Sequence, residues 1–496
     1  MTASSPQRTA SALFNERRAG VLLHPTSLLS SAPGDGLQAA ALRFLDFLAD
    51  AGFSLWQMLP IGPTHADGSP YQLLSAHAGS SDLICLDALR ARGWLDTSPR
   101  PRAQALAAAA LGFQEALARD PALARRYSEF QRCQCGWIGD YALFIALRER
   151  YGLNNWCDWP QALRRRDPQA LVEAGVELRE RIAGVCFEQF AFFEQWRALR
   201  AAARERGIYL FGDLPIFVSH DSADVWAHQD LFRLGGDGLP LAVAGVPPDY
   251  FSATGQRWGN PLYDWERMRA RGFDWWLARL RGQLGFFDLI RIDHFRGFEA
   301  FWEIPAQATT AVAGRWVDAP GEALLDAFFE DNAHLPLVAE NLGVITDAVE
   351  ALRRRFGLPG MLVLQFAFDG SARNPYLPHR HDTLEVVYTG THDNDTTLGW
   401  YQSLDARTRS RVDAYLGHSS EPMPWPLVRA ALASVARLAV VPMQDLLGLD
   451  SGARMNTPGT MRAENWRWRL DHSHLTTELA AQCRDRLALY GRLVDQ

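Results

Sequence analysis

Apolar residues along this chain gather in eight short runs, and several of these runs end directly in polar residues. The runs cover residues 19–24, 54–60, 208–213, 289–294, 336–341, 361–366, 384–393 and 438–445. Longer stretches of mixed polarity separate most of them. This alternation predicts strands separated by helices.

The stretches between the runs carry helical signals. Residues 37–51 have the pattern of an amphipathic helix that ends before Gly52, and residues 187–207 place Phe and Trp on one face. Residues 347–357 begin with an acid and end with several Arg, which suits the helix dipole. Eight strands with helices between them predict an α/β fold, a (β/α)8 TIM barrel, which typically needs about 250 residues.

The chain has 496 residues, so we expect large insertions in the βα-loops. Residues 66–185, between the second and third strands, are rich in Ala, Arg and Leu and predict a mostly helical insertion. Residues 219–281, between the third and fourth strands, are rich in Gly, Pro and aromatic residues and predict an ordered loop. Both leave from the C-terminal face, where barrel enzymes place their function. We therefore expect one catalytic barrel over residues 1–496.

Composition narrows the class of function. A net charge of −7 provides no basic surface for nucleic acid or an anionic membrane, and no apolar run approaches the ~20 residues of a membrane span. All 50 basic residues are Arg, and without Lys the chain cannot be a pyridoxal Schiff-base enzyme or carry a Walker A loop. Six scattered cysteines favour free thiols in a reducing compartment, so we expect a cytoplasmic protein.

The fourth run carries the first candidate chemistry. Strand alternation puts Ile290 and Ile292 on one face, and Leu289, Arg291 and Asp293 on the other. A neighbouring guanidinium lowers the pKa of a carboxyl group, which would keep Asp293 ionised as a nucleophile must be. The same pair is equally typical of a buried ion pair that holds a barrel layer, because structural pairs also perturb pKa values.

Polar residues end three other predicted strands: Asp213, Glu340, and His392 with Asp393. In a barrel, these side chains converge on the Arg–Asp pair at one mouth. Carboxylates around the mouth of a barrel in a chain with 17 Trp indicate either a metal site or glycosidic-bond chemistry. A metal site would want more His or a tighter acidic cluster, so we expect no metal.

Glycoside chemistry requires two carboxyl groups in different environments. Glu340 follows the apolar residues 335–339, where desolvation would raise its pKa and suit a general acid. Alternatively, Glu340 caps the helix after the fifth strand. Asp393 could hold sugar hydroxyls, or it could be a turn residue in the polar run 391–396.

Four ordered segments carry a resemblance to a known family. Residues 212–218 (GDLPIFV), 291–297 (RIDHFRG), 339–343 (AENLG) and 390–396 (GTHDNDT) resemble the four motifs of the α-amylase superfamily. In this form they are similar to the amylomaltase (4-α-glucanotransferase) family. Further matches lie at residues 69–72, 221–226, 247–265, 443–449 and 453–459, and the resemblance as a whole extends over nearly the entire chain.

The resemblance implies a role for each candidate at the strand ends. Asp293 would be the nucleophile, Glu340 the acid/base and Asp393 the transition-state stabiliser. The side chains that would support them in the catalytic subsite are Arg291, His392 and Asp213.

Aromatic residues of two loops complete the implied substrate site. Tyr71 would stack on the sugar or hydrogen-bond to it. Tyr250, Phe251 and Trp258 would belong to a long loop that overhangs the acceptor side. Without the resemblance, these loop aromatics would be read as a small local core.

The function implied is that of a retaining 4-α-glucanotransferase. It would transfer α-1,4-glucan segments among malto-oligosaccharides, starch or glycogen chains, with glucose as an acceptor and without a cofactor. The alternatives are an α-1,4-glucan hydrolase and an inactive glucan-binding protein. The catalytic motifs do not decide between transfer and hydrolysis, which differ in whether sugar or water resolves the intermediate.

Overall fold

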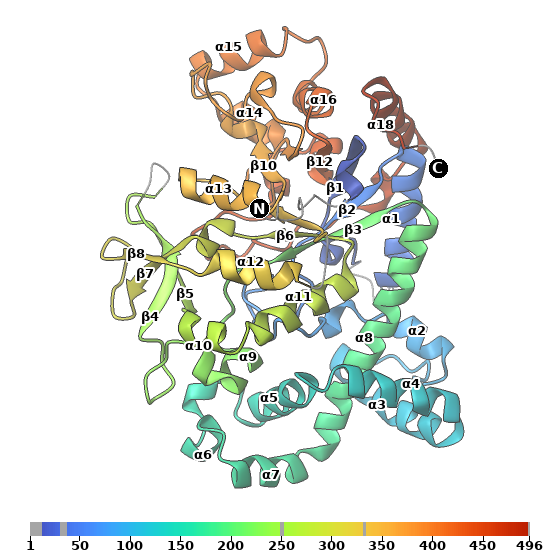
Figure 1. Ribbon diagram of the computed structural model, residues 1–496. Helices are drawn as coiled ribbons and strands as arrows, with labels where there is room; N and C mark the ends of the chain where they lie inside the picture. The colour runs from blue at the N-terminus through green and yellow to red at the C-terminus, as the bar shows by residue number, and fades with distance from the viewer. Residues whose placement is uncertain (1–11, 30–36, 249–251, 331–333, 495–496) are drawn as a thin grey trace, which may run out of the picture.

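Eight parallel strands form the central sheet of the computed structural model, which describes residues 12–29, 37–248, 252–330 and 334–494 (Figure 1). Their spatial order is β10-β11-β12-β1-β2-β3-β6-β9. Each strand overlaps one of the eight predicted runs, and the predicted (β/α)8 barrel is confirmed. The bounds are β1 Arg18–Leu22, β2 Leu55–Gln57, β3 Tyr209–Leu214, β6 Leu289–Ile292, β9 Leu337–Ala339, β10 Gly360–Val363, β11 Glu385–Tyr388 and β12 Leu438–Pro442.

The first and last strands of that order, β10 and β9, meet at a seam that a side chain helps to close. A backbone hydrogen bond of 2.8 Å joins the start of β10 to the end of β9. Next to it, Asn341 Oδ1 accepts the Met361 N–H at 2.8 Å, and Asn341 Nδ2 donates to Glu350 Oε1 at 2.7 Å. Asn341 therefore fixes the seam one residue beyond Glu340.

Side chains alternate between the barrel interior and the surrounding helices, as the pattern predicted. Leu289 belongs to the interior apolar cluster, together with Phe211 and Val338 from the neighbouring strands. Ile290 and Ile292 belong to the cluster that includes the surrounding helices. The alternation therefore turns Arg291 inward and anchors its strand from outside.

The three predicted helices are all present, and in two of them the ends differ from the predicted residues. The helix predicted at 37–51 is α1, Leu37–Ala51; that at 187–207 is the longer α8, Arg179–Glu205; and that at 347–357 is α13, Asp347–Arg355. The remaining helices of the barrel and its C-terminal part are α11 Asp274–Phe286, α12 Gly321–Phe329, α14 Thr397–Ser403, α15 Ala406–Tyr415, α16 Trp425–Ala433, α17 Met443–Leu446 and α18 Thr477–Leu489.

Six helices follow β2 and lie together at one end of the molecule, from which α8 returns to the barrel (Figure 1, bottom). They fall within the region where a helical insertion was predicted. Their bounds are α2 Leu86–Ala91, α3 Arg102–Arg119, α4 Pro121–Cys133, α5 Ile138–Arg150, α6 Gln161–Arg164 and α7 Pro168–Glu177. Phe113 of α3 packs among Trp94, Phe187 and Phe190, so this group shares an aromatic core with α8.

A four-stranded antiparallel sheet, in the order β5-β4-β7-β8, was not predicted. It pairs β4 Ala242–Val246 and β5 Gln256–Pro261 with β7 Ala300–Pro305 and β8 Arg315–Asp318. Its first two strands, with helices α9 Ala223–Ala227 and α10 Trp265–Ala270, lie where an ordered loop was expected. Segments on both sides of β6 are thereby joined, which local composition does not reveal.

The six cysteines are distributed between the surface and the interior of the molecule. All six cysteines are free thiols, as predicted. Cys133 and Cys135 are exposed, and Cys85, Cys186 and Cys483 are buried. Within the described part of the chain, none of the helices has the length and apolar character needed to cross a membrane.

We expect Asn341→Ala to destabilise the barrel, because it leaves the buried Met361 N–H without its acceptor. The loss of such a partner costs about 1–3 kcal/mol, which should appear as a lower thermal midpoint in calorimetry. The matched control is Asn155→Ala, which also removes a bond from an Asn side chain to a backbone N–H, that of Cys157. Cys157 is less buried, so water can replace that bond. Equal midpoint shifts in the two variants would contradict a special role for the seam.

Candidate active site

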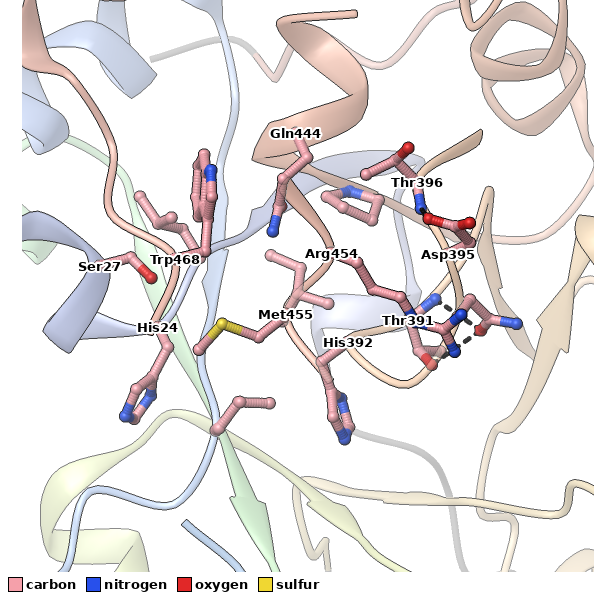
Figure 2. Close-up of a pocket in the computed structure, with 15 residues that line it drawn as sticks. His24, Ser27, Thr391, His392, Asp395, Thr396, Gln444, Arg454, Met455 and Trp468 are labelled. Carbon is pink, nitrogen blue, oxygen red and sulfur yellow. Dashed lines mark hydrogen bonds between the residues drawn. The ribbon is translucent and has the colours of Figure 1, made fainter. Parts of the chain in front are cut away.

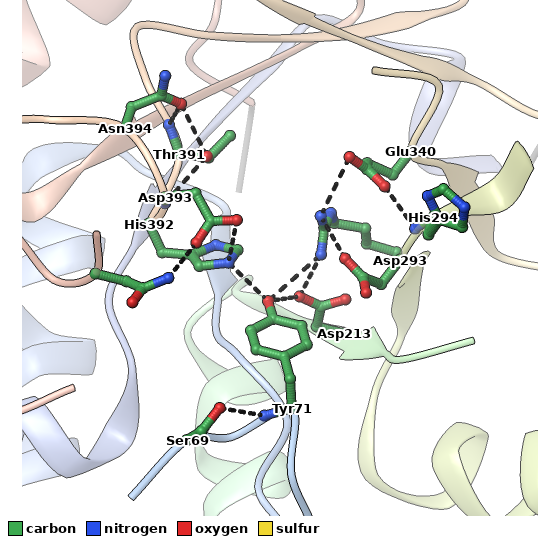
Figure 3. Close-up of polar contacts among 12 residues, drawn as sticks. Ser69, Tyr71, Asp213, Asp293, His294, Glu340, Thr391, His392, Asp393 and Asn394 are labelled. Atoms are coloured by element: carbon green, nitrogen blue, oxygen red, sulfur yellow. Dashed lines mark hydrogen bonds and ion pairs between the residues drawn. The ribbon is translucent and has the colours of Figure 1, made fainter. Parts of the chain in front are cut away.

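The predicted catalytic residues lie at the C-terminal ends of the barrel strands (Figure 3). Asp293 directly follows β6, and its N–H donates to the Leu214 carbonyl of β3 at 3.0 Å. Glu340 directly follows β9, and its N–H donates to the Ile292 carbonyl of β6 at 3.1 Å. The backbone hydrogen bonds of the sheet thus continue through both residues and fix them side by side.

Arg291 lies between three carboxyl groups. Its Nη1 donates to Asp213 Oδ2 at 2.6 Å, and its Nη2 lies 2.9 Å from Asp293 Oδ1 and 3.8 Å from Glu340 Oε1. The side chain of Arg291 is only 5% exposed, whereas those of Asp293 and Glu340 are 27% and 16% exposed. The guanidinium is therefore internal, and the two carboxyl groups remain accessible to a substrate.

The contacts of Nη2 limit the separation of the carboxyl pair. Asp293 Oδ1 lies 2.9 Å and Glu340 Oε1 lies 3.8 Å from this one nitrogen. The two oxygens therefore cannot be farther apart than the sum of these two distances. Enzymes that invert at the anomeric carbon hold the two groups about 6.5–9.5 Å apart, and retaining enzymes about 5–5.5 Å apart. This limit includes the separation of retaining enzymes and excludes nearly all of the inverting range.

Burial separates the pKa values of these two groups. It raises the pKa of Glu340 to about 8, against the opposing effect of Arg291. Burial also raises the pKa of Asp293, to about 6. The predicted direction for Glu340 holds. Arg291 does lower the pKa of Asp293, as predicted, but desolvation outweighs the ion pair, so the expected net decrease is wrong. Near pH 7 the pair still holds one ionised and one protonated carboxyl group, which is the combination that acid-assisted displacement requires.

Tyr71 and His392 form the opposite wall. The Tyr71 hydroxyl donates to Asp213 Oδ2 at 2.6 Å, so it accepts from His392 Nε2 at 2.9 Å. Burial lowers the pKa of His392, and its neutral ring stacks on Tyr71 with centroids 5.3 Å apart. Asp393 Oδ2 lies 3.4 Å from the same Nε2, and 45% of the Asp393 side chain is exposed to the cleft. The wall thus presents a flat aromatic surface beside a carboxylate.

Three residues at this wall were not singled out in the sequence. Asn456 Nδ2 donates to Asp393 Oδ1 at 2.6 Å, and Arg454 Nη2 donates to the Asp393 carbonyl at 2.7 Å. The Trp466 ring lies 5.9 Å from that of Tyr71. All three lie beyond the last barrel strand, where no periodic pattern marks them. The only signal was the family match at residues 453–459, which covers Arg454 and Asn456.

Trp258 reaches the catalytic pair through His294. The two rings meet edge to face with centroids 4.9 Å apart, and the His294 N–H donates to Glu340 Oε2. The Trp258 ring thus lies against His294, whose backbone binds the acid/base candidate, and its place on the acceptor side stays a prediction. Tyr250 and Phe251, predicted to belong to the same loop, lie outside the described residues.

A small cavity borders His392 (Figure 2). His24 and Ser27 line it from the end of β1, and Gln444 lines it from α17. His24 Nδ1 and Ser27 Oγ are buried without a hydrogen-bond partner. Sequence reasoning did not identify this cavity. Among the described residues, no group of three or more His, Cys, Asp or Glu is arranged to hold a metal ion.

One protein family matches this sequence over most of its length. A model described as 4-alpha-glucanotransferase (glycoside hydrolase family 77) matches residues 23–476. A 4-alpha-glucanotransferase of Thermus thermophilus is 49% identical over 490 residues, which cover 94% of this chain and 97% of the relative. That of Synechocystis sp. is 45% identical over 504 residues, which cover 97% and 99%.

Solved structures agree with these matches. The amylomaltase from Streptococcus agalactiae, in complex with acarbose, superposes with a TM-score of 0.91 at 34% identity, covering 97% of this chain and 100% of that one. The amylomaltase from Corynebacterium glutamicum, at 19% identity and a TM-score of 0.76, shares the fold. Sequence and fold agree along nearly the whole length, and the chain belongs to the 4-alpha-glucanotransferase family of glycosyl-transferring enzymes.

Proposed function

We propose that this enzyme transfers α-1,4-glucan segments by a retaining double displacement, with Asp293 as nucleophile and Glu340 as acid/base. Asp293 attacks the anomeric carbon while Glu340 gives its proton to the departing glycosidic oxygen. A β-glucosyl–enzyme ester forms as the α-1,4 bond breaks. Glu340, now a carboxylate, takes the proton of an incoming 4-hydroxyl, whose oxygen displaces Asp293 and forms a new α-1,4 bond.

The observation that carries this proposal is the shared contact of Asp293 and Glu340 with Arg291 Nη2, at 2.9 Å and 3.8 Å. It limits the separation of the carboxyl groups to a range that includes that of retaining enzymes, which supports the proposal. Burial makes Glu340 the weaker acid of the two, so the proton resides on the group that has to donate it.

The other wall suits the sugar ring that reacts. In this proposal Tyr71 stacks beneath the ring, and Asp393 accepts hydroxyl protons and stabilises positive charge that develops at the anomeric carbon. Asn456 and His392 hold the Asp393 carboxylate at 2.6 Å and 3.4 Å. Asp213 contributes by holding Arg291 and Tyr71.

Two observations favour transfer over hydrolysis. The relatives matched over the whole chain are named as glucanotransferases, and acarbose, the ligand of the Streptococcus agalactiae amylomaltase, is consistent with malto-oligosaccharide substrates. In this proposal Trp258, whose ring packs against His294 next to Glu340, covers the side from which an acceptor, including glucose, would approach, and a covered site excludes water. No observation favours an inactive glucan-binding protein, because the carboxyl pair is complete.

The proposed reaction also suggests a metabolic role, a location and a use for the two insertions. We place the reaction in starch or glycogen metabolism, and the free thiols are consistent with a cytoplasmic location. The chain would work as one catalytic barrel, with the two insertions at residues 66–185 and 219–281 shaping the entrance for long glucans.

Incubation with maltotriose tests the proposed function directly. We expect a ladder of longer malto-oligosaccharides together with glucose, resolved by anion-exchange chromatography. A transferase leaves the number of reducing ends constant, because each bond that breaks is replaced. A steady rise in reducing ends without longer products would instead identify a hydrolase, and unchanged maltotriose would contradict any catalytic function.

Asp293→Asn and Glu340→Gln should each lower kcat by several orders of magnitude, because each removes a group that forms or breaks bonds. Binding of malto-oligosaccharides, measured by calorimetry, should remain. The matched controls are Asp96→Asn and Glu115→Gln, which also neutralise acids paired with Arg, but on the surface of the helical region. Near-normal activity of Asp293→Asn would overturn the assignment of the nucleophile.

The pH profile of kcat/KM should be bell-shaped. Activity rises as Asp293 ionises, near pH 6, and falls as Glu340 loses its proton, near pH 8. The two limbs belong to the interacting pair rather than to either residue alone. Initial rates between pH 4 and pH 10 provide the check. A profile that stays flat between pH 5 and pH 9 would contradict the proposed proton transfer.

A further inference from the structure

The loop that joins β11 to α14 carries His392 and Asp393 at its middle. Thr389 begins the loop directly after β11, and Thr397 ends it as the first residue of α14. The tip is positioned closely, since His392 Nε2 lies 2.9 Å from the Tyr71 hydroxyl and Asp393 Oδ1 lies 2.6 Å from Asn456 Nδ2. The ends of the loop must therefore also be held with precision.

Both ends are bound to one carboxyl group, that of Asp445 in α17. The hydroxyl groups of Thr389 and Thr397 each lie 2.6 Å from Asp445 Oδ2, and the Thr397 N–H donates to Asp445 Oδ1 at 2.7 Å. Asp445 is 1% exposed and follows β12 by three residues. Two points at opposite ends of the loop are thereby tied to a neighbouring strand of the barrel.

The chemistry of Asp445 suits this task better than that of an amide. A carboxylate offers only acceptor sites, and here three donors converge on its two oxygens. An Asn side chain would turn one acceptor into an NH2 group that faces two buried hydroxyls, and at least one donor would lose its partner. Among the described residues, no Arg or His lies within ion-pair distance of Asp445, so these hydrogen bonds are what stabilise it.

Other contacts hold the loop on both sides of its tip: on the near side the Gln365 N–H donates to the Thr389 carbonyl at 3.3 Å, and shorter bonds from side chains hold the far side. Gln365 Nε2 donates to the Asp395 carbonyl at 2.9 Å, and Ser451 Oγ donates to Asp395 Oδ2 at 2.6 Å. On the near side, the Thr389 hydroxyl donates a hydrogen bond to Asp445. Without Asp445, the near end of the loop would lose its side-chain hydrogen bond and be held at Thr389 by the longer backbone hydrogen bond to Gln365.

We infer that Asp445 is a positioning residue, which binds both ends of the 389–397 loop and so sets the place of His392 and Asp393 against the reacting sugar. The inference rests on the proposed function, because Asp393 acts on the sugar only if transfer occurs at this site. Asp445 lies behind the loop and touches no substrate. Its effect reaches the reaction through the loop.

The test compares two double variants, one of which removes the hydroxyl groups while the other keeps them. Thr389→Val with Thr397→Val removes both hydroxyls while keeping the shape of the side chains. Thr389→Ser with Thr397→Ser keeps both hydroxyls and removes the methyl groups. We expect the valine pair to lower kcat for maltotriose disproportionation about 10- to 100-fold with little change in KM, since small displacements of catalytic groups have effects of this size. The serine pair should retain activity close to that of the wild type.

A separate variant distinguishes positioning from general stability. Thr476 caps α18 through its hydroxyl, far from the mouth of the barrel, and Thr476→Val should lower the thermal midpoint while leaving kcat unchanged. If the valine pair also lowers only the midpoint, and kcat per folded molecule stays at the wild-type value, the inference is overturned.

Asp445→Asn keeps the volume of the side chain and provides a second measurement if the valine pair fails to fold. A reduced kcat at an unchanged KM is expected, and wild-type kcat would count against the inference. Failure of the proposed function is distinguishable, because the wild type would then form no oligosaccharide ladder. An active wild type with an equally active Asp445→Asn and valine pair would refute only the role of Asp445.

Discussion

The interaction on which the site depends is that of one buried guanidinium with three carboxyl groups. Asp213, Asp293 and Glu340 lie close together at the mouth of the barrel, where water is scarce and like charges repel. Arg291 reaches all three because its two terminal nitrogens point in different directions, and its charge is permanent. A single ammonium group could not divide its contacts in this way, and the chain contains no Lys.

The position of that guanidinium depends on the barrel. Arg291 follows Leu289 on the inner face of β6, and the isoleucines between and beyond them pack outward against helices. Hydrogen bonds from Asp293 to β3 and from Glu340 to β6 continue the sheet into the site. The carboxyl pair therefore has the rigidity of a sheet, and its burial keeps one group protonated and the other ionised near neutral pH.

The second wall is built differently. His392 and Asp393 lie on a loop, and a loop keeps its shape only when its ends and its tip are bound. Asn456 and Tyr71 bind the tip, and Asp445 binds the ends. One wall thus takes its precision from backbone pairing, and the other takes it from side chains that come from three separate parts of the chain.

Local pattern was enough to predict the eight strands and the outward isoleucines and to single out Asp293, Glu340 and Asp393 as candidates, whose roles came from the family resemblance. Each of these depends on neighbours in the sequence: alternation along a strand, or a short run with particular side chains. The tertiary structure alone decided the antiparallel sheet around β4 and β7, the seam at Asn341, and the contacts of Asn456 and Asp445. It also reversed the expected pKa shift of Asp293. All of these depend on which distant segments pack together, and on how much water that packing removes from a charged group.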